Sequence, residues 1–390
     1  VVLNFDRAEK LIGEAIPKET IKSILSSLDI KINNITESGI GMTIPAYRND
    51  VTREVDVIEE ILRVYGYNKI QFKSKLNASV SKSSRFADHK IQQVTGNLLA
   101  SLGFNEILNN SLTTPVYASL NDAFKEDYNV TMLNPLSTDL SVMRQSLLFS
   151  GLEVVAFNSN RRQPDLKLFE FGKSYHNFPG GREEHKHLTL LLSGKQNAEN
   201  WFQQQQNTTF FNLKGNVEAV LSRLGIAQWK VKPLKDAQFS EGLEYSVQKK
   251  QVVSFGLVSK AIRNHFDIEQ EVLYADFNWD TILDLVQQNK IKFAPIPKNP
   301  AVRRDFALLL DQEVTFDQIY QEAYMVEKKL LKNVALFDVY EGENLPEGKK
   351  SYAVSFTLQD EHKTLTDKEI DKIMNKLQQR FEKSLNAELR

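Results

Sequence analysis

The chain has 390 residues, 41% of them hydrophobic, and nearly balanced charge, with 49 basic and 50 acidic side chains. This length predicts two or three domains with cores of their own, and the charge balance argues against a protein that coats nucleic acid. The absence of cysteine excludes disulfides and thiolate metal sites and favours a reducing cytoplasm. No apolar run approaches the roughly 18–20 residues that cross a bilayer. The start, which has neither an initiating Met nor signal-peptide features, suggests a fragment.

Residues 1–75 are expected to form a first unit. A helix is predicted from Pro17 to Leu28, because proline is tolerated in a first turn and apolar residues recur on one side. Alternating apolar and polar residues predict a β-hairpin over residues 29–44, and a second helix should follow it. A helix, a hairpin and a helix also describe a DNA-binding winged-helix module. The second helix argues against that alternative, because it presents carboxylates where a recognition helix would present Arg, Lys or Asn.

This second helix should begin at a cap formed by Asp50 or Thr52 and end at Gly66, which adopts a left-handed conformation at little cost. Its predicted apolar stripe consists of Val55, Ile58, Ile61, Leu62 and Tyr65.

Four acids accompany this helix. Asp56, Glu59 and Glu60 fall at i, i+3 and i+4 and should share one exposed face, and Asp50 lies at the start. Acids at this spacing repel each other unless a cation neutralises them, and oxygen ligands without Cys or His suit Mg2+ or Ca2+. The alternative is a solvated acidic face that favours the positive N-terminal end of the helix.

A polar, serine-rich stretch at residues 73–84 is predicted to be a linker. Residues 85–290 then mix helical and strand-like segments without βαβ alternation, so an antiparallel sheet with flanking helices is expected. The predicted strands are 104–112, 166–173 and 188–192, and the predicted helices are 91–102 and one that follows residue 148.

Three prolines between residues 295 and 300 predict a boundary. The last unit has the element order β-α-β-β-α-β, which is the ferredoxin-like pattern. Its predicted strands are 306–310, 336–341, 351–358 and 387–389, and its predicted helices are 316–328 and 368–381.

The acidic helix carries a long motif. Residues 48–67, Arg-Asn-Asp-Val-Thr-Arg-Glu-Val-Asp-Val-Ile-Glu-Glu-Ile-Leu-Arg-Val-Tyr-Gly-Tyr, resemble the signature of the B5 domain, a winged-helix-like module of the β chain of bacterial phenylalanyl-tRNA synthetase. The resemblance implies that one Mg2+ binds near the partner subunit to the carboxylates of Asp50, Asp56, Glu59 and Glu60.

Residues 133–144 and 168–173 resemble the strands around motif 2 of class II aminoacyl-tRNA synthetases, in the form carried by the β chain. In that family this region is the catalytically silent partner of the α chain. The glycine-plus-arginine signature of active class II sites, Gly-x-Gly-x-x-x-Arg, is absent from the sequence. No catalytic residue is therefore assigned, and Arg144 and Glu170 are interpreted as a structural pair. His185 and His187 could share one side of a strand, but a metal site there is not favoured without Cys or an acid partner.

Residues 297–390 resemble the ferredoxin-fold anticodon-binding module at the end of bacterial β chains. The matching segments begin at Lys298, Leu336 and Gly348. A sheet that binds unpaired loop bases needs aromatic rings and a few phosphate contacts. The candidate rings are Phe337, Tyr340 and Tyr352, and the candidate tRNA-binding cations are Arg303, Arg304, Lys349 and Lys350.

Together these resemblances predict an α+β protein with a B5 domain at 1–75, a class II-like core at 76–290 and an anticodon-binding domain at 297–390. They imply the C-terminal portion of a β chain that joins an α chain, as two α and two β, to charge tRNA-Phe with phenylalanine using ATP and Mg2+. This chain would supply the subunit interface and anticodon recognition. The family's N-terminal tRNA-binding and editing domains are not in the sequence, so it does not predict editing. The alternatives are a stand-alone nucleic-acid-binding or regulatory module and a structural scaffold.

Overall fold

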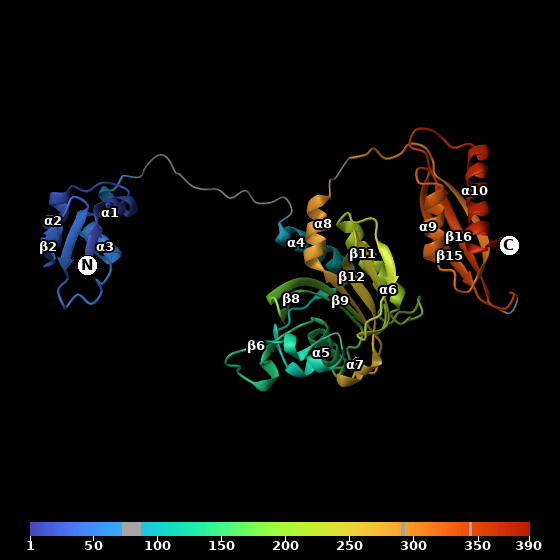
Figure 1. Ribbon diagram of the computed structural model, residues 1–390, viewed down its shortest axis with the longest axis horizontal. Helices are drawn as coiled ribbons and strands as arrows, with labels where there is room; N and C mark the ends of the chain where they lie inside the picture. The colour runs from blue at the N-terminus through green and yellow to red at the C-terminus, as the bar shows by residue number, and fades with distance from the viewer. Residues whose placement is uncertain (72–86, 123, 290–292, 343–344) are drawn as a thin grey trace. The chain divides into compact units, whose positions relative to one another are not determined.

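The computed structural model describes residues 1–71, 87–122, 124–289, 293–342 and 345–390 (Figure 1). Packing divides the chain into two compact units, Val1–Ser83 and Ser84–Arg390. The linker predicted at residues 73–84 lies outside the described residues. In the part of the chain that is described, no helix has both the length and the apolar character needed to cross a membrane.

The first unit packs three helices against a three-stranded antiparallel sheet with the order β1-β3-β2. Its elements are β1 (Val2–Asn4), α1 (Phe5–Ile12), α2 (Lys18–Ser27), β2 (Lys31–Ile35), β3 (Gly39–Thr43) and α3 (Glu54–Tyr65). The predicted helix, hairpin and second helix are confirmed. Helix α1 was not predicted, and it begins where the side chain of Asn4 accepts a hydrogen bond from the backbone N–H of Arg7. Gly39 is required in β3, because a Cβ there would lie 2.2 Å from the carbonyl oxygen of Leu3.

The predictions for α3 need three corrections. The N-cap is Arg53 rather than Asp50 or Thr52, because the side chain of Asp56 reaches back to the backbone of Arg53. The apolar stripe is rotated from the predicted one. Its centre is formed by buried residues that include Val57, whereas Val55 is 37% exposed. The helix ends at Gly66 as expected, but the φ of 101° and ψ of 116° there differ from the predicted left-handed conformation.

A seven-stranded sheet with the order β10-β11-β12-β13-β9-β8-β4 forms the middle of the chain. All neighbours are antiparallel except β4 and β8, which confirms the predicted antiparallel sheet. The strands are β4 (Asn105–Glu106), β8 (Leu166–Phe178), β9 (Gly181–Ser193), β10 (Lys230–Pro233), β11 (Phe239–Val247), β12 (Lys250–Val258) and β13 (Val272–Asn278).

Helices cover both faces of this sheet (Figure 1). One face packs on α4 (Asp88–Ser101), α6 (Phe210–Arg223) and α8 (Trp279–Gln288), and the other on α5 (Leu148–Ser159) and α7 (Lys260–His265). A small antiparallel sheet with the order β5-β7-β6 is formed by β5 (Leu112–Thr113), β6 (Val130–Thr131) and β7 (Val142–Met143). The strand predicted at 104–112 is therefore mostly irregular. Short 3-10 helices lie at Tyr67–Lys69, Pro115–Ser119, Glu126–Tyr128 and Thr138–Leu140.

The last sheet has the order β15-β16-β14-β17, and two helices pack on one of its faces. Its elements are β14 (Val302–Asp311), α9 (Phe316–Val326), β15 (Leu331–Tyr340), β16 (Lys349–Leu358), α10 (Asp367–Leu385) and β17 (Glu388–Leu389). This confirms the predicted β-α-β-β-α-β order. The hydrophobic core of this sheet is separate from the cores of residues 84–289. The boundaries of the three domains stay predictions.

Candidate functional sites

Three of the four acids predicted to bind Mg2+, Asp50, Asp56 and Glu60, contact arginines. A carboxylate oxygen of Asp50 lies 2.8 Å from Nη2 of Arg48, and one of Glu60 lies 3.0 Å from the same nitrogen. Glu60 also accepts a hydrogen bond of 2.6 Å from Nη2 of Arg63. Because two arginines cover it, Glu60 is only 8% exposed, and the prediction that it lies on an exposed face is wrong. Glu59 is exposed, as expected.

Asp56 holds the first turn of α3 together. Its carboxylate accepts the backbone N–H groups of Thr52 at 3.1 Å and Arg53 at 2.8 Å, and it pairs with Nη2 of Arg53 at 2.9 Å. The hydrogen bonds from the Arg53 side chain and from these backbone groups lower the pKa of Asp56 to about 2. A negative charge is also favoured at the positive end of a helix. This acid is therefore committed to the local structure.

As they are arranged, these carboxylates do not fit a Mg2+ ion, which requires several oxygen ligands converging on one point. Within the described residues, no group of three or more acidic, histidine or cysteine side chains could hold a metal ion. Arg48, Arg53 and Arg63 supply the positive charge that the spacing of the acids demands. The Mg2+ site stays a prediction that depends on the sequence resemblance.

A buried ion pair joins the small sheet to the large one. Nη1 of Arg144, which follows β7, lies 2.9 Å from Oε1 of Glu170 on β8, and the two side chains are 4% and 1% exposed. Nε of Arg144 donates to the carbonyl of Lys173, and Glu170 also accepts from the backbone and side-chain amides of Asn109. Gly172 provides the necessary space, since a Cβ there would lie 2.4 Å from Arg144 Nη2. The expected pair is present and fully buried.

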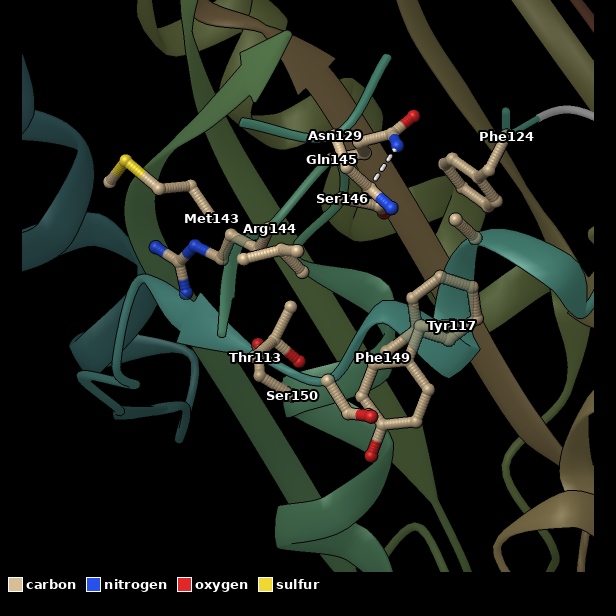
Figure 2. A pocket seen from close by; sticks show the side chains of 13 residues that line it. Thr113, Tyr117, Phe124, Asn129, Met143, Arg144, Gln145, Ser146, Phe149 and Ser150 are labelled. Atoms are coloured by element: carbon tan, nitrogen blue, oxygen red, sulfur yellow. Dashed lines mark hydrogen bonds between the residues drawn. The ribbon is translucent and has the colours of Figure 1, made fainter. Parts of the chain in front are cut away.

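A small cavity lies beside this pair (Figure 2). The guanidinium of Arg144 points away from Tyr117 and Phe149, which line the cavity on its other side. The cavity volume is about 10 Å³, and holding a single water molecule requires roughly 10–15 Å³. The cavity therefore has no room for an amino acid or a nucleotide.

The four candidate tRNA-binding cations do not form one patch. In the antiparallel pairing of β14 with β16, Arg303 is opposite Thr357, whereas Lys349 is opposite Asp311. The two cations lie eight residues apart along β14, or about 27 Å at ~3.4 Å per residue. Lys349 pairs with Asp311 at 2.8 Å.

The two other cations face the helices. Side chains alternate between the two faces along a strand, and Lys350 is opposite Leu310 of the core. Arg304 and Lys350 therefore lie on the face that packs on α9 and α10. Arg304 pairs with Asp367 at the start of α10, at 3.2 Å, and Lys350 is only 7% exposed.

Two arginines cover aromatic rings on the free face of this sheet, which is the face opposite α9 and α10. The guanidinium carbon of Arg303 lies 4.9 Å from the centre of the Phe337 ring, and that of Arg390 lies 5.9 Å from the Tyr340 ring. Both rings are exposed, at 54% and 39%. A register shift between β15 and β16 falls at Phe337, and such bulges re-aim side chains. The sequence pattern did not single out Arg390.

The third candidate ring, Tyr352, is opposite Leu308 and packs against the helix-facing core. Phe337, Tyr340, Arg303 and Arg390 therefore constitute the free-face cluster. Exposed rings with neighbouring guanidinium groups on an open sheet are typical of proteins that bind unpaired nucleic-acid bases.

Comparison with known families agrees with this class. Residues 57–279 match the family described as Phenylalanyl tRNA synthetase beta chain CLM domain. Residues 297–390 match the Ferredoxin-fold anticodon binding domain, and residues 1–67 match the tRNA synthetase B5 domain. The chain belongs to the phenylalanyl-tRNA synthetase β chain family, which confirms the family and the α+β fold class predicted from the motifs.

Curated relatives extend the match over the whole chain. The Phenylalanine–tRNA ligase beta subunit of Bacteroides thetaiotaomicron is 46% identical, and the alignment covers 100% of this chain and 49% of the relative. The corresponding subunit of Porphyromonas gingivalis is 40% identical with the same coverage. The chain thus spans about half the length of the curated relatives it matches. Among solved structures, the pyrrolysyl-tRNA synthetase of Desulfitobacterium hafniense is 13% identical with a TM-score of 0.43, over 70% of this chain and 90% of that one.

We expect Asp56→Ala to loosen the start of α3, because the N–H groups of Thr52 and Arg53 lose their acceptor. Acid should act in the same direction. The folded pKa of about 2 lies below the ordinary value of 3.8, so this contribution to stability is present above 3.8 and is lost as the pH falls towards about 2. Amide hydrogen exchange of residues 54–65 measures both effects.

Glu59→Ala is the matched control on the same helix, since Glu59 is exposed. Equal exchange in the wild type and in Asp56→Ala would contradict the capping role. If Mg2+ slowed exchange in the wild type but not in Asp56→Ala, the arginine-paired arrangement would be wrong for the magnesium-bound protein.

Arg144→Ala should lower the free energy of unfolding of the middle sheet by about 3–5 kcal/mol, because Glu170 would remain buried without its counter-charge. The three tryptophans of the chain lie at positions 201, 229 and 279, so their fluorescence during urea unfolding monitors this region. Lys250→Ala is the control, because its pair with Asp284 is about half exposed and should contribute at most ~1 kcal/mol. Equal losses in the two variants would contradict the importance of the buried pair.

Proposed function

We propose that this chain is the part of a phenylalanine–tRNA ligase β subunit that recognises the anticodon region of tRNA-Phe. The observation that carries this proposal is the free-face cluster, which lies in the segment that matches the anticodon-binding domain. A flat aromatic ring can stack on an unpaired base, and a guanidinium beside it can contact the adjoining phosphate in two places. The cluster therefore suits the single-stranded loop of an RNA better than a duplex.

Small residues separate the two ring–arginine pairs. Ala307 on β14 is opposite Ala353 on β16, and Ala335 on β15 is opposite Ser355 on β16, while the β15 partner of Ala353 is Asp338. Small side chains let a base approach the sheet closely, and the rings on either side then limit where it stacks. We propose that one base stacks near Phe337 and another near Tyr340.

In this proposal an α chain holds the aminoacylation site, and the complex of two α and two β chains charges tRNA-Phe in the cytoplasm using ATP and Mg2+. Two features of the middle domain support a silent role for the β chain. Arg144 is bound to Glu170 and is not free to grip a phosphate. The adjoining cavity is also too small for either substrate. The middle domain would instead contribute to the interface with the α chain.

The chain alone should not form phenylalanyl-adenylate. The test is phenylalanine-dependent exchange of pyrophosphate into ATP, measured on the purified chain, with a mock preparation from the same host as the background. The activity should appear when a cognate α chain is added. Exchange above the background without an α chain would contradict the silent role.

Arg303→Ala and Phe337→Ala should each weaken tRNA-Phe binding to the complex with the α chain. Loss of one stacked ring costs about 1–3 kcal/mol, or roughly 5- to 150-fold in affinity. Loss of Arg303 should also lower the slope of log affinity against log salt by about one. Fluorescence anisotropy at several salt concentrations measures both quantities, and pyrophosphate exchange should not change.

Arg304→Ala is the matched control, because it removes the same charge from the next residue but on the helix-facing side. It should leave the affinity and the salt slope close to those of the wild type. If Arg304→Ala weakened binding as much as Arg303→Ala, the proposed face would be wrong.

A further inference from the structure

Four polar side chains form a continuous hydrogen-bonded chain on one face of the large sheet. Nε2 of His176 lies 3.1 Å from Oγ of Ser174, and this oxygen lies 2.8 Å from Nε2 of His187. On its other side, Nδ1 of His187 lies 2.7 Å from Oδ1 of Asp276. The register brings them together. His187 on β9 is opposite Gly172 on β8 and Asn278 on β13. Its ring therefore lies between Ser174, two residues after Gly172, and Asp276, two residues before Asn278.

The order of Ser174, His187 and Asp276 is that of a hydrolytic triad, but the site lacks access for a substrate. Ser174 is 1% exposed, and His176 occupies the other side of its hydroxyl. A nucleophile must reach the carbonyl carbon that it attacks. The arrangement therefore points to movement of protons within the chain and not to catalysis.

The serine hydroxyl has one proton, so it can donate to only one of its two histidine neighbours at a time. When His187 is neutral, the carboxylate of Asp276 keeps the proton of His187 on Nδ1. Nε2 of His187 is then an acceptor, and the Ser174 hydroxyl donates to it. The Ser174 oxygen in turn accepts a proton from His176, which must carry that proton on Nε2.

When His187 gains a proton, both of its ring nitrogens become donors. Nε2 of His187 then donates to the Ser174 oxygen, and the hydroxyl rotates to donate to His176. His176 must now present an unprotonated Nε2, so its own proton lies on Nδ1. We propose that Ser174 couples the two imidazoles, so that gain of a proton by His187 reverses both hydrogen bonds and switches the tautomer of His176.

The surrounding charges favour the protonated form of His187. Burial lowers the pKa of His187. The nearby Asp276 raises this pKa through its charge and its hydrogen bond, and the charge of Asp280 on α8 adds to the effect, so the pKa is raised overall. Arg144 acts in the opposite direction and is itself paired with Glu170.

Burial and the nearby His185 and His187 lower the pKa of His176 to about 4. Because this pKa lies below the raised pKa of His187, His176 changes its tautomer without changing its charge when His187 titrates. Because the pKa of His187 is raised in the folded chain, the stability it contributes is full below its ordinary value of 6.5 and is lost as the pH rises through the folded value.

The switch reaches the end of the β8–β9 hairpin. The ring of His176 stacks on Phe178 with the ring centres 5.1 Å apart and the planes within 2°, and it lies 5.5 Å from the ring of His185. Moving the N–H from Nε2 to Nδ1 changes which edge of this stacked ring can donate to its surroundings. A proton gained next to Asp276 is thus communicated to the hairpin through a single hydroxyl.

The test is nitrogen-15 NMR of the full chain labelled on histidine, titrated between pH 5 and 9 (about the range in which histidine changes charge). Two-bond proton–nitrogen correlations distinguish the tautomers, and His176→Gln and His187→Gln assign the signals. We expect His176 to carry its proton on Nδ1 below the midpoint of His187 and on Nε2 above it, with both transitions at the same pH. A single His176 tautomer throughout the titration of wild-type His187 would overturn the proposal without requiring any variant.

Ser174→Ala removes the coupling atom and should leave His187 titrating while the tautomer of His176 no longer follows it. Ser193→Ala is the matched control, because Ser193 is also buried on this sheet and contacts Gln270 instead of a histidine. Coupling that persists in Ser174→Ala, or disappears in Ser193→Ala, would contradict transmission through the Ser174 hydroxyl.

Discussion

The middle of the chain depends on the buried ion pair between Arg144 and Glu170. Two charges removed from water are tolerated only when their remaining hydrogen-bonding groups are also satisfied, and here backbone carbonyls and amides complete both sides. The small sheet, whose strands have two residues each, is far shorter than the ~5–6 residues of a typical strand. Arg144 anchors that sheet to β8 and is thereby committed to a structural role. One interaction thus stabilises the fold and occupies the guanidinium of Arg144.

The last domain illustrates a different constraint, the two-residue repeat of a strand. Neighbouring cations such as Arg303 and Arg304 are forced to opposite faces. The helix-facing cation pairs with Asp367, while the other covers Phe337 on the open side. The pairing register then places Lys349 at the far end of the same strands. A cluster of cations in the sequence therefore need not be a cluster in space, and the free-face cluster is assembled instead from β14, β15 and the residue after β17.

The order of most elements could be predicted from the sequence because hydrophobic periodicity and turn residues are local. The motifs identified the family for the same reason, since each is a continuous segment. The features that could not be predicted depend on contacts between residues distant in the chain, or on which neighbours a long side chain contacts. Glu60 is buried because Arg48 and Arg63 cover it, and the position of Phe337 depends on a register shift. Arg390 is placed by strand pairing with β14, and helix α1 was missed because its cap, Asn4, lies in a short strand.

The arginines of this chain differ in function because their partners differ in exposure. Arg144 and Arg48 contact acids that are 1% and 8% exposed. Removing Arg144 would leave Glu170 without its counter-charge, and removing Arg48 would leave Glu60 with Arg63 alone. Such residues cannot be released for a ligand at low cost. Arg303 contacts Asp305 and an exposed ring, both in water, where an ion pair contributes little. Exchanging that weak contact for a phosphate would therefore cost little. This difference in exposure separates the arginines that hold the fold from those that we propose contact RNA.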